Sequence, residues 1–107
     1  MQTLTAPELA AWLQDTGRDA PQVLDVREPW EVAYAALPGA LTIPMGQVPN
    51  RLEDLDPERA VICLCHHGMR SMQVALYLER CGFDQVWNLA GGIDAWARQV
   101  DPRCPTY

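Results

Sequence analysis

Short apolar runs alternate along the chain with segments in which apolar residues recur at helical spacing. The apolar runs are bounded by Pro, Gly and Asp, so they predict buried strands at residues 23–26, 40–43, 60–64 and 85–89. The segments between them predict helices at residues 6–17, 29–36, 48–55, 72–81 and 93–98. This alternation is typical of an α/β fold: one small domain over residues 1–107, with a mainly parallel, roughly five-stranded sheet flanked by helices on both faces.

Side-chain spacing on the predicted helices indicates which faces are buried. Leu9, Trp12 and Leu13 form one face of the first helix, which begins at the capping box Thr5-Ala6-Pro7-Glu8. A stripe on the helix of residues 72–81 ends in Cys81, which we therefore expect in the core. Cys104 follows in a Pro-rich tail, where we expect an exposed thiol. Packing roles are also expected for all four tryptophans, Trp12, Trp30, Trp87 and Trp96.

Composition and charge exclude several classes of function. The 107 residues are 49% hydrophobic, which suffices for one compact domain with a core of its own. Acidic residues outnumber basic ones by 14 to 8, and this balance argues against a nucleic-acid partner. No apolar run is long enough to span a membrane, and no secretory signal is visible at the N-terminus. All basic residues are Arg, so lysine Schiff-base chemistry is excluded.

Four cysteines occur without the spacing of a disulfide framework. Cys63 and Cys65 fall on the same face of a predicted strand, with Cα atoms roughly 6.6 Å apart, at the long edge of disulfide geometry. Free thiols and a reducing, cytoplasmic location are therefore expected. We interpret Cys63 as a buried core residue, with a role as a resolving thiol as the alternative.

The segment Cys65-His66-His67-Gly68-Met69-Arg70-Ser71 joins a predicted strand to a predicted helix. A short loop at a helix N-terminus directs several backbone N–H groups towards one centre, where they favour a thiolate. Arg70 would add positive charge, and Ser71 would cap the helix or donate a hydrogen bond to a bound anion. The pattern predicts a nucleophilic or sulfur-carrying Cys65, with substrate contacts from His66, His67, Gly68, Met69, Arg70 and Ser71.

Two further segments, Asp25 to Arg27 and Gly91-Gly92, lie at the carboxyl ends of predicted strands, which is where ligands bind in open parallel sheets. Asp25 and Arg27 are interpreted as a supporting network that pins the strand ends. Gly91-Gly92 lacks the spacing of a dinucleotide loop, so no nucleotide cofactor is expected. A metal site at Cys63, Cys65 and the histidines is disfavoured, because consecutive side chains diverge and no second ligand pair follows.

Four segments together are similar to one protein family in the order of their motifs. They are the loop 65–71, Leu24-Asp25-Val26-Arg27-Glu28 with Glu31, Leu37-Pro38-Gly39-Ala40 with Ile43-Pro44, and Asn88-Leu89-Ala90-Gly91-Gly92-Ile93-Asp94-Ala95-Trp96. In this order they resemble the rhodanese-like sulfurtransferases. The chain departs from that pattern at Ala35-Ala36-Leu37, where many members carry Gly-His.

The resemblance implies sulfur transfer through a persulfide on Cys65. A small donor such as thiosulfate or a persulfide would supply the sulfur, and cyanide, a thiol or a protein would accept it. Many rhodaneses carry an Arg where this chain has histidines. His66 and His67 would give a weaker, pH-dependent field at that position, or would simply be solvated loop residues.

Three alternative functions remain at this stage. The first is a relay module that passes sulfur between proteins with little thiosulfate turnover, and the second is a non-catalytic binding or regulatory domain. The third is a phosphatase or arsenate reductase of the same fold. Loop length disfavours the third, because four residues separate Cys65 from Arg70, whereas the related oxyanion enzymes have a loop longer by one residue.

Overall fold

A computed structural model describes residues 1–107 of the chain. Its strands are β1 (Gln2–Leu4), β2 (Gln22–Asp25), β3 (Leu41–Thr42), β4 (Val61–Leu64) and β5 (Val86–Leu89). Its α-helices are α1 (Ala6–Gln14), α2 (Pro29–Tyr34), α3 (Met69–Arg80) and α4 (Gly92–Gln99). Two 3₁₀ helices, η1 (Met45–Asn50) and η2 (Leu52–Asp54), precede β4.

The five strands form one sheet in the order β1-β5-β4-β2-β3, and all neighbours are parallel. β4 lies at the centre, with Cys63 opposite Leu24 of β2 and Asn88 of β5. The predicted α/β fold with a parallel sheet is confirmed. Because all strands run the same way, their carboxyl ends meet at one edge of the sheet.

The edge strand β1 is the one strand that no apolar run predicts. It has three residues, of which Leu4 alone is buried, and it is held by pairing with β5. The predicted helix at residues 48–55 is instead a pair of 3₁₀ helices, in which backbone N–H groups bond the carbonyl three residues earlier, as Arg51 does with Val48 and Leu55 with Leu52. The capping box at the start of α1 is present, with Glu8 N–H bonded to Thr5 Oγ1 at 3.2 Å.

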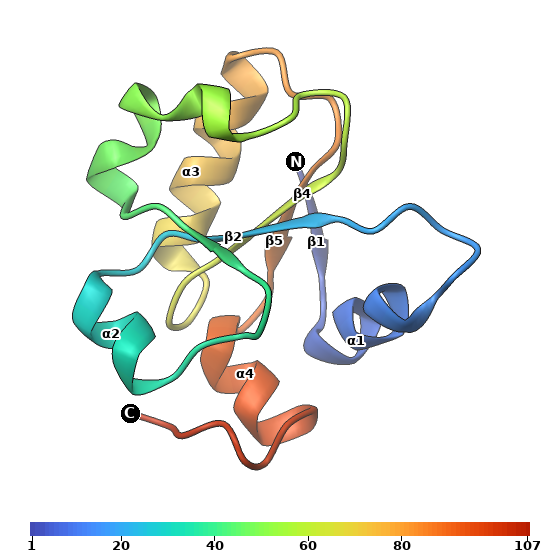
Figure 1. The fold of residues 1–107 in the computed structure, drawn as a ribbon, viewed down its shortest axis with the longest axis vertical. Coiled ribbons are helices and arrows are strands. Elements are labelled where there is room, and N and C mark those ends of the chain that lie inside the picture. The colour runs from blue at the N-terminus through green and yellow to red at the C-terminus, as the bar shows by residue number, and fades with distance from the viewer.

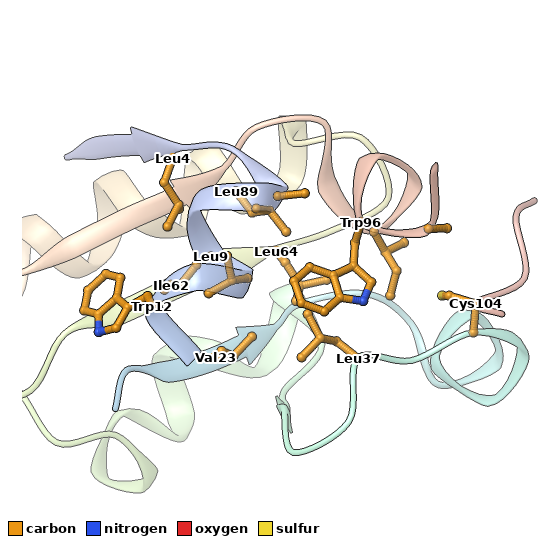
Figure 2. Close-up of a cluster of buried hydrophobic side chains, with 14 of the residues drawn as sticks. Leu4, Leu9, Trp12, Val23, Leu37, Ile62, Leu64, Leu89, Trp96 and Cys104 are labelled. Carbon is orange, nitrogen blue, oxygen red and sulfur yellow. The ribbon is translucent and has the colours of Figure 1, made fainter. Parts of the chain in front are cut away.

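Two apolar clusters cover the two faces of the sheet. α1 and α4 lie on one side, whereas α3 and the 3₁₀ turns lie on the other (Figure 1). Figure 2 shows the first cluster, in which Leu9 of α1 and Trp96 of α4 meet Ile62 and Leu64 of β4. The second cluster packs Val74 and other α3 residues against the opposite face. The predicted helices on both faces are therefore present.

Several expected burial states are wrong. Cys104 is buried in the first cluster, because the tail folds back over α4 and places its thiol against that core (Figure 2). Cys81 is exposed because it is the residue at which α3 ends. Trp30 is 66% exposed, since the short α2 turns the neighbouring Glu31 inward instead. Leu13 is also exposed, at 42%, and lines a hollow between α1 and α4.

None of the helices combines the length and apolar character that crossing a membrane requires.

Candidate active site

Cys65 directly follows the central strand β4, at the carboxyl edge of the sheet, and its side chain is only 1% exposed. The chain then curves tightly into α3. Gly68 is the N-cap of this helix and has a φ of 110°, a conformation that side-chain-bearing residues rarely adopt. Because Gly68 is the N-cap, Ser71 does not have the capping role that was one of the two expected for it. Ser71 lies buried inside the first turn of α3.

Hydrogen-bond donors surround the Cys65 sulfur. The Gly68 N–H group donates to Sγ at 3.1 Å, and the Ser71 hydroxyl lies 3.3 Å from it. Burial by itself would raise the pKa of the Cys65 thiol. The Ser71 hydroxyl and the N–H groups of Ser71, Gly68 and His67 outweigh that effect and hold the pKa below the usual 9.0. The loop therefore favours a thiolate at neutral pH more than an ordinary surface cysteine site does.

The N-terminus of α4 supports this loop from behind. The N–H groups of Ile93 and Asp94 donate to the carbonyl oxygens of Cys65 and His66 at 2.9 and 3.2 Å. A carbonyl held in this direction turns the N–H groups that follow it towards the sulfur. Gly92 lies so close that a Cβ atom there would be 2.4 Å from both carbonyl oxygens. Because the glycine pair 91–92 carries no side chains, the backbone at the start of α4 can approach the loop closely.

Asn88 of β5 connects the middle of the loop to the first turn of α3. Its amide Nδ2 donates to the carbonyl oxygen of Gly68 at 3.1 Å, and its Oδ1 lies 2.6 Å from the Ser71 hydroxyl, which has a single hydrogen to donate either to this oxygen or to the Cys65 sulfur. The side chain is 3% exposed, so these two bonds satisfy a buried amide. Asn88 therefore fixes Ser71 beside the Cys65 sulfur.

Arg70 is held in a two-point ion pair. Its Nη1 and Nη2 donate to Oε1 and Oε2 of Glu31 on α2 at 2.7 and 2.8 Å. The side-chain hydrogen bonds from Arg70 are the largest cause that lowers the pKa of Glu31, to about 2. The positive charge expected from Arg70 is thus largely balanced by a carboxylate. The backbone and Ser71 donors contact the sulfur directly, and Arg70 does not.

Asp25 and Arg27 form a buried ion pair at the end of β2. Arg27 Nη2 donates to Asp25 Oδ2 at 2.6 Å, and the side chains are 0% and 1% exposed. Arg27 also donates to the carbonyl oxygens of Glu31 and Ala35 at 3.3 and 2.7 Å. The pair thus ties the β2 end to α2, as the network interpretation predicts, and neither side chain hydrogen-bonds the Cys65 sulfur.

The remaining loop side chains differ in exposure. His66 is half-buried; its ring stacks on that of Tyr107 and meets that of His67 at a tilt of 32°, with centroid separations of 3.8 and 3.9 Å. His67 is exposed. Met69 is 71% exposed at the start of α3. These three residues line the outside of the loop, whereas the backbone lines the inside.

Cys63 lies beneath Cys65 in the same apolar cluster and is completely buried. Burial raises its pKa to about 12, so it stays a neutral thiol. All four cysteines are free. No group of three or more His, Cys, Asp or Glu side chains is arranged to hold a metal ion.

The cavities of the surface lie away from Cys65. One is at the amino ends of the strands, beside Trp12 and Arg59, and the other lies between α1 and α4, beside Leu13 and Trp96. Cys65 is instead enclosed by its loop.

Glu31 and Asn88 lie in the segments that resemble the family, but the sequence pattern gives them no place at the site, and it places Gly92 only at the same edge of the sheet. No sequence feature indicates a role for Tyr107. Glu31 and Asn88 are polar residues beside predicted buried positions, which is a signal that could have marked them. Nothing in the local pattern around Tyr107 indicates its contact with the loop.

Fold and site together define a class of protein: a parallel α/β domain that holds a buried cysteine inside a loop of donors that lower its pKa. The family model "Rhodanese-like domain" matches residues 5–99. The chain therefore belongs to the rhodanese-like domain family.

Relatives and solved structures agree with this assignment. A protein of Allochromatium vinosum named "Sulfurtransferase" is 42% identical over 80 residues, which are 75% of this chain and 75% of that protein. The Arabidopsis thaliana "Rhodanese-like/PpiC domain-containing protein 12, chloroplastic" is 41% identical over all of this chain, which spans 38% of the plant protein. A "Rhodanese-like Domain Protein" from Staphylococcus aureus has a similar crystal structure, with a TM-score of 0.86, 31% identity, and coverage of 100% and 99% of the two chains.

Proposed function

We propose that this chain is a sulfurtransferase that carries sulfane sulfur as a persulfide on Cys65. The observation that carries the proposal is the set of hydrogen bonds around the Cys65 sulfur, which lowers its pKa inside a nearly closed loop. The name of the A. vinosum relative supports the same reaction class. The proposed site comprises Cys65 as nucleophile, residues 66–71 as the substrate cradle, and Asp25 with Arg27 as supports.

The proposed reaction has two steps. In the first, the Cys65 thiolate attacks the outer sulfur of a donor such as thiosulfate; a new S–S bond forms, the donor S–S bond breaks, and sulfite leaves with the electron pair. In the second, cyanide or a thiolate attacks the outer sulfur of the persulfide and restores the Cys65 thiolate. Negative charge lies within the loop throughout, and preorganised N–H donors stabilise it without reorientation.

A second candidate, relay between proteins, is favoured by the charges at the site. Arg70 is paired with Glu31, Arg27 is buried against Asp25, and the chain has no Lys. A thiosulfate dianion therefore meets no unpaired guanidinium in the loop. A persulfide on a protein or small thiol carries less charge and depends less on such a cation.

The proposal also covers the extent of the domain along the chain and its cellular compartment. We propose that the rhodanese-like domain occupies all of residues 1–107, because β1 pairs with β5 and Tyr107 bonds Arg27. The four free cysteines support a reducing compartment such as the cytoplasm.

Intact-mass measurement of the reduced protein tests the proposal. After brief exposure to thiosulfate or to a cysteine persulfide, we expect the gain of one sulfur atom, its removal by cyanide, and no gain in Cys65→Ser. A gain from the persulfide alone supports the relay candidate. No gain from either donor overturns the proposed function and leaves a binding or regulatory domain.

A further inference from the structure

Tyr107 reaches the Cys65 loop from the far end of the sequence. The tail after α4 turns back to α2 (Figure 1), where the Tyr107 ring packs edge-on against Trp30 and Tyr34. The ring centroids are 6.0 and 5.7 Å apart. These contacts hold Tyr107 on the side of the site that α2 forms.

The Tyr107 hydroxyl joins the two ion pairs beside the site. It accepts a hydrogen bond from Arg27 Nη1 at 2.9 Å and donates one to Glu31 Oε2 at 2.7 Å. The same Glu31 carboxylate accepts both bonds from Arg70. The other bond of Arg27 Nη1, to the Glu31 carbonyl oxygen, is long at 3.3 Å. The phenol therefore completes the bonding of a buried cation and fixes the carboxylate that holds Arg70.

The Tyr107 ring contacts the loop directly. It stacks on His66 with a centroid separation of 3.8 Å and an interplanar angle of 6°. Nε2 of His66 is buried and has no hydrogen-bond partner. The His66 ring is thus oriented by its contacts with the rings of Tyr107 and His67, since its Nε2 makes no hydrogen bond.

We propose that Tyr107 is a positioning residue for Cys65. It holds the loop at His66 through its ring and at Arg70 through Glu31. Gly68, whose N–H group donates to the Cys65 sulfur, lies between these two points. A loop fixed on both sides of Gly68 keeps its donors aimed at the sulfur, and a loop released at either side does not. Tyr107 itself touches neither the sulfur nor a substrate position.

This inference deepens the proposed function, because it concerns what keeps Cys65 reactive, but its test does not require sulfur transfer. The reaction of Cys65 with iodoacetamide would be followed across pH, with each cysteine resolved by peptide mass spectrometry. Tyr107→Phe keeps the ring and loses the hydroxyl, whereas Tyr107→Leu loses both. Tyr34→Phe is the matched control, since Tyr34 also touches the Tyr107 ring, is 55% exposed, and makes no hydrogen bond through its hydroxyl.

At neutral pH we expect Tyr107→Phe to slow alkylation of Cys65 about fivefold, the factor that corresponds to loss of one ordinary hydrogen bond. Tyr107→Leu should slow it further and move the profile towards higher pH, and Tyr34→Phe should match wild type. Rates are compared only under conditions in which circular dichroism shows that the variant is folded. Wild-type rates and profile in Tyr107→Leu overturn the inference; if that variant does not fold, a wild-type rate in Tyr107→Phe overturns it. Absence of persulfide in the wild type would contradict the proposed function alone.

Discussion

The contact between Gly92 and the Cys65 loop offers a direct test of how the site is built. In Gly92→Ala, the new Cβ atom would lie 2.4 Å from the carbonyl oxygens of Cys65 and His66. Real Cβ contacts are essentially never closer than 3.0 Å, so the loop or α4 must move by at least 0.6 Å, the difference between the two distances. That movement weakens the bonds from Ile93 and Asp94 that orient the loop.

The size of the effect follows from two contributions. Gly92 has a φ of 59°, and alanine in this left-handed region costs about 1 kcal/mol of folding free energy. The clash with two carbonyl oxygens adds to this cost, for a total loss of about 2–4 kcal/mol. A displacement approaching 1 Å at the reacting group costs about 100-fold in rate. We therefore expect sulfur uptake by Cys65 to fall by about 100-fold in protein that is still folded.

Gly39→Ala is the matched control. Gly39 has a φ of 82°, but nothing lies within 4 Å of a Cβ atom there. This variant should lose about 1 kcal/mol of stability from the backbone alone and keep its activity. Stability would be measured by urea unfolding, and activity by the rate of persulfide formation in intact-mass experiments. Equal stability of the two variants, together with near wild-type activity in Gly92→Ala, would refute the reasoning.

Three further predictions concern single side chains. Ser71→Ala removes a hydroxyl donor that lowers the Cys65 pKa, so the pH profile of Cys65 alkylation should move towards higher pH; an unchanged profile contradicts the assigned hydrogen bond. Cys63→Ala should retain persulfide formation and lose about 1 kcal/mol of stability from a small cavity, whereas loss of turnover with retained uptake would support a resolving thiol. Glu31 has a folded pKa of about 2 against an ordinary 4.5, so its stabilisation is present above pH 4.5 and disappears as the pH falls towards 2. Urea unfolding across this range should show a loss of about 2 kcal/mol, allowing for the partial exposure of Arg70, and Glu31→Gln should not show it.

The central fold follows from sequence because its signals are local. Strands β2, β4 and β5 are apolar runs between turn residues, and α1 begins at a capping box that the structure reproduces. The edge strand β1 lacks such a run, since only Leu4 faces a core and pairing with β5 supplies its order. Strand order between distant segments is a tertiary property that local patterns do not encode.

The candidate site divides in the same way. Cys65 and its loop are contiguous in sequence, so their chemistry could be predicted from residue types. The pairing of Arg70 with Glu31 and the stacking of Tyr107 on His66 join residues far apart in the chain. The sequence predicts the positive charge of Arg70 but not its ion pair, because its partner comes from another helix. The burial of Cys104 is a tertiary property of the same kind, since only the return of the tail buries it.

Because the chain is synthesised from its N-terminus, α4 is made after the Cys65 loop that it supports. A ribosome releases Cys65 before Asn88 of β5 and before Gly92, whose helix supports the Cys65 and His66 carbonyls. Until those residues have emerged and folded, the loop lacks the bonds that shape it, and its cysteine has the reactivity of an ordinary thiol. If Cys65 carries sulfur as proposed, efficient loading would therefore require a finished domain. Nascent and unfolded chains would then be spared a reactive persulfide.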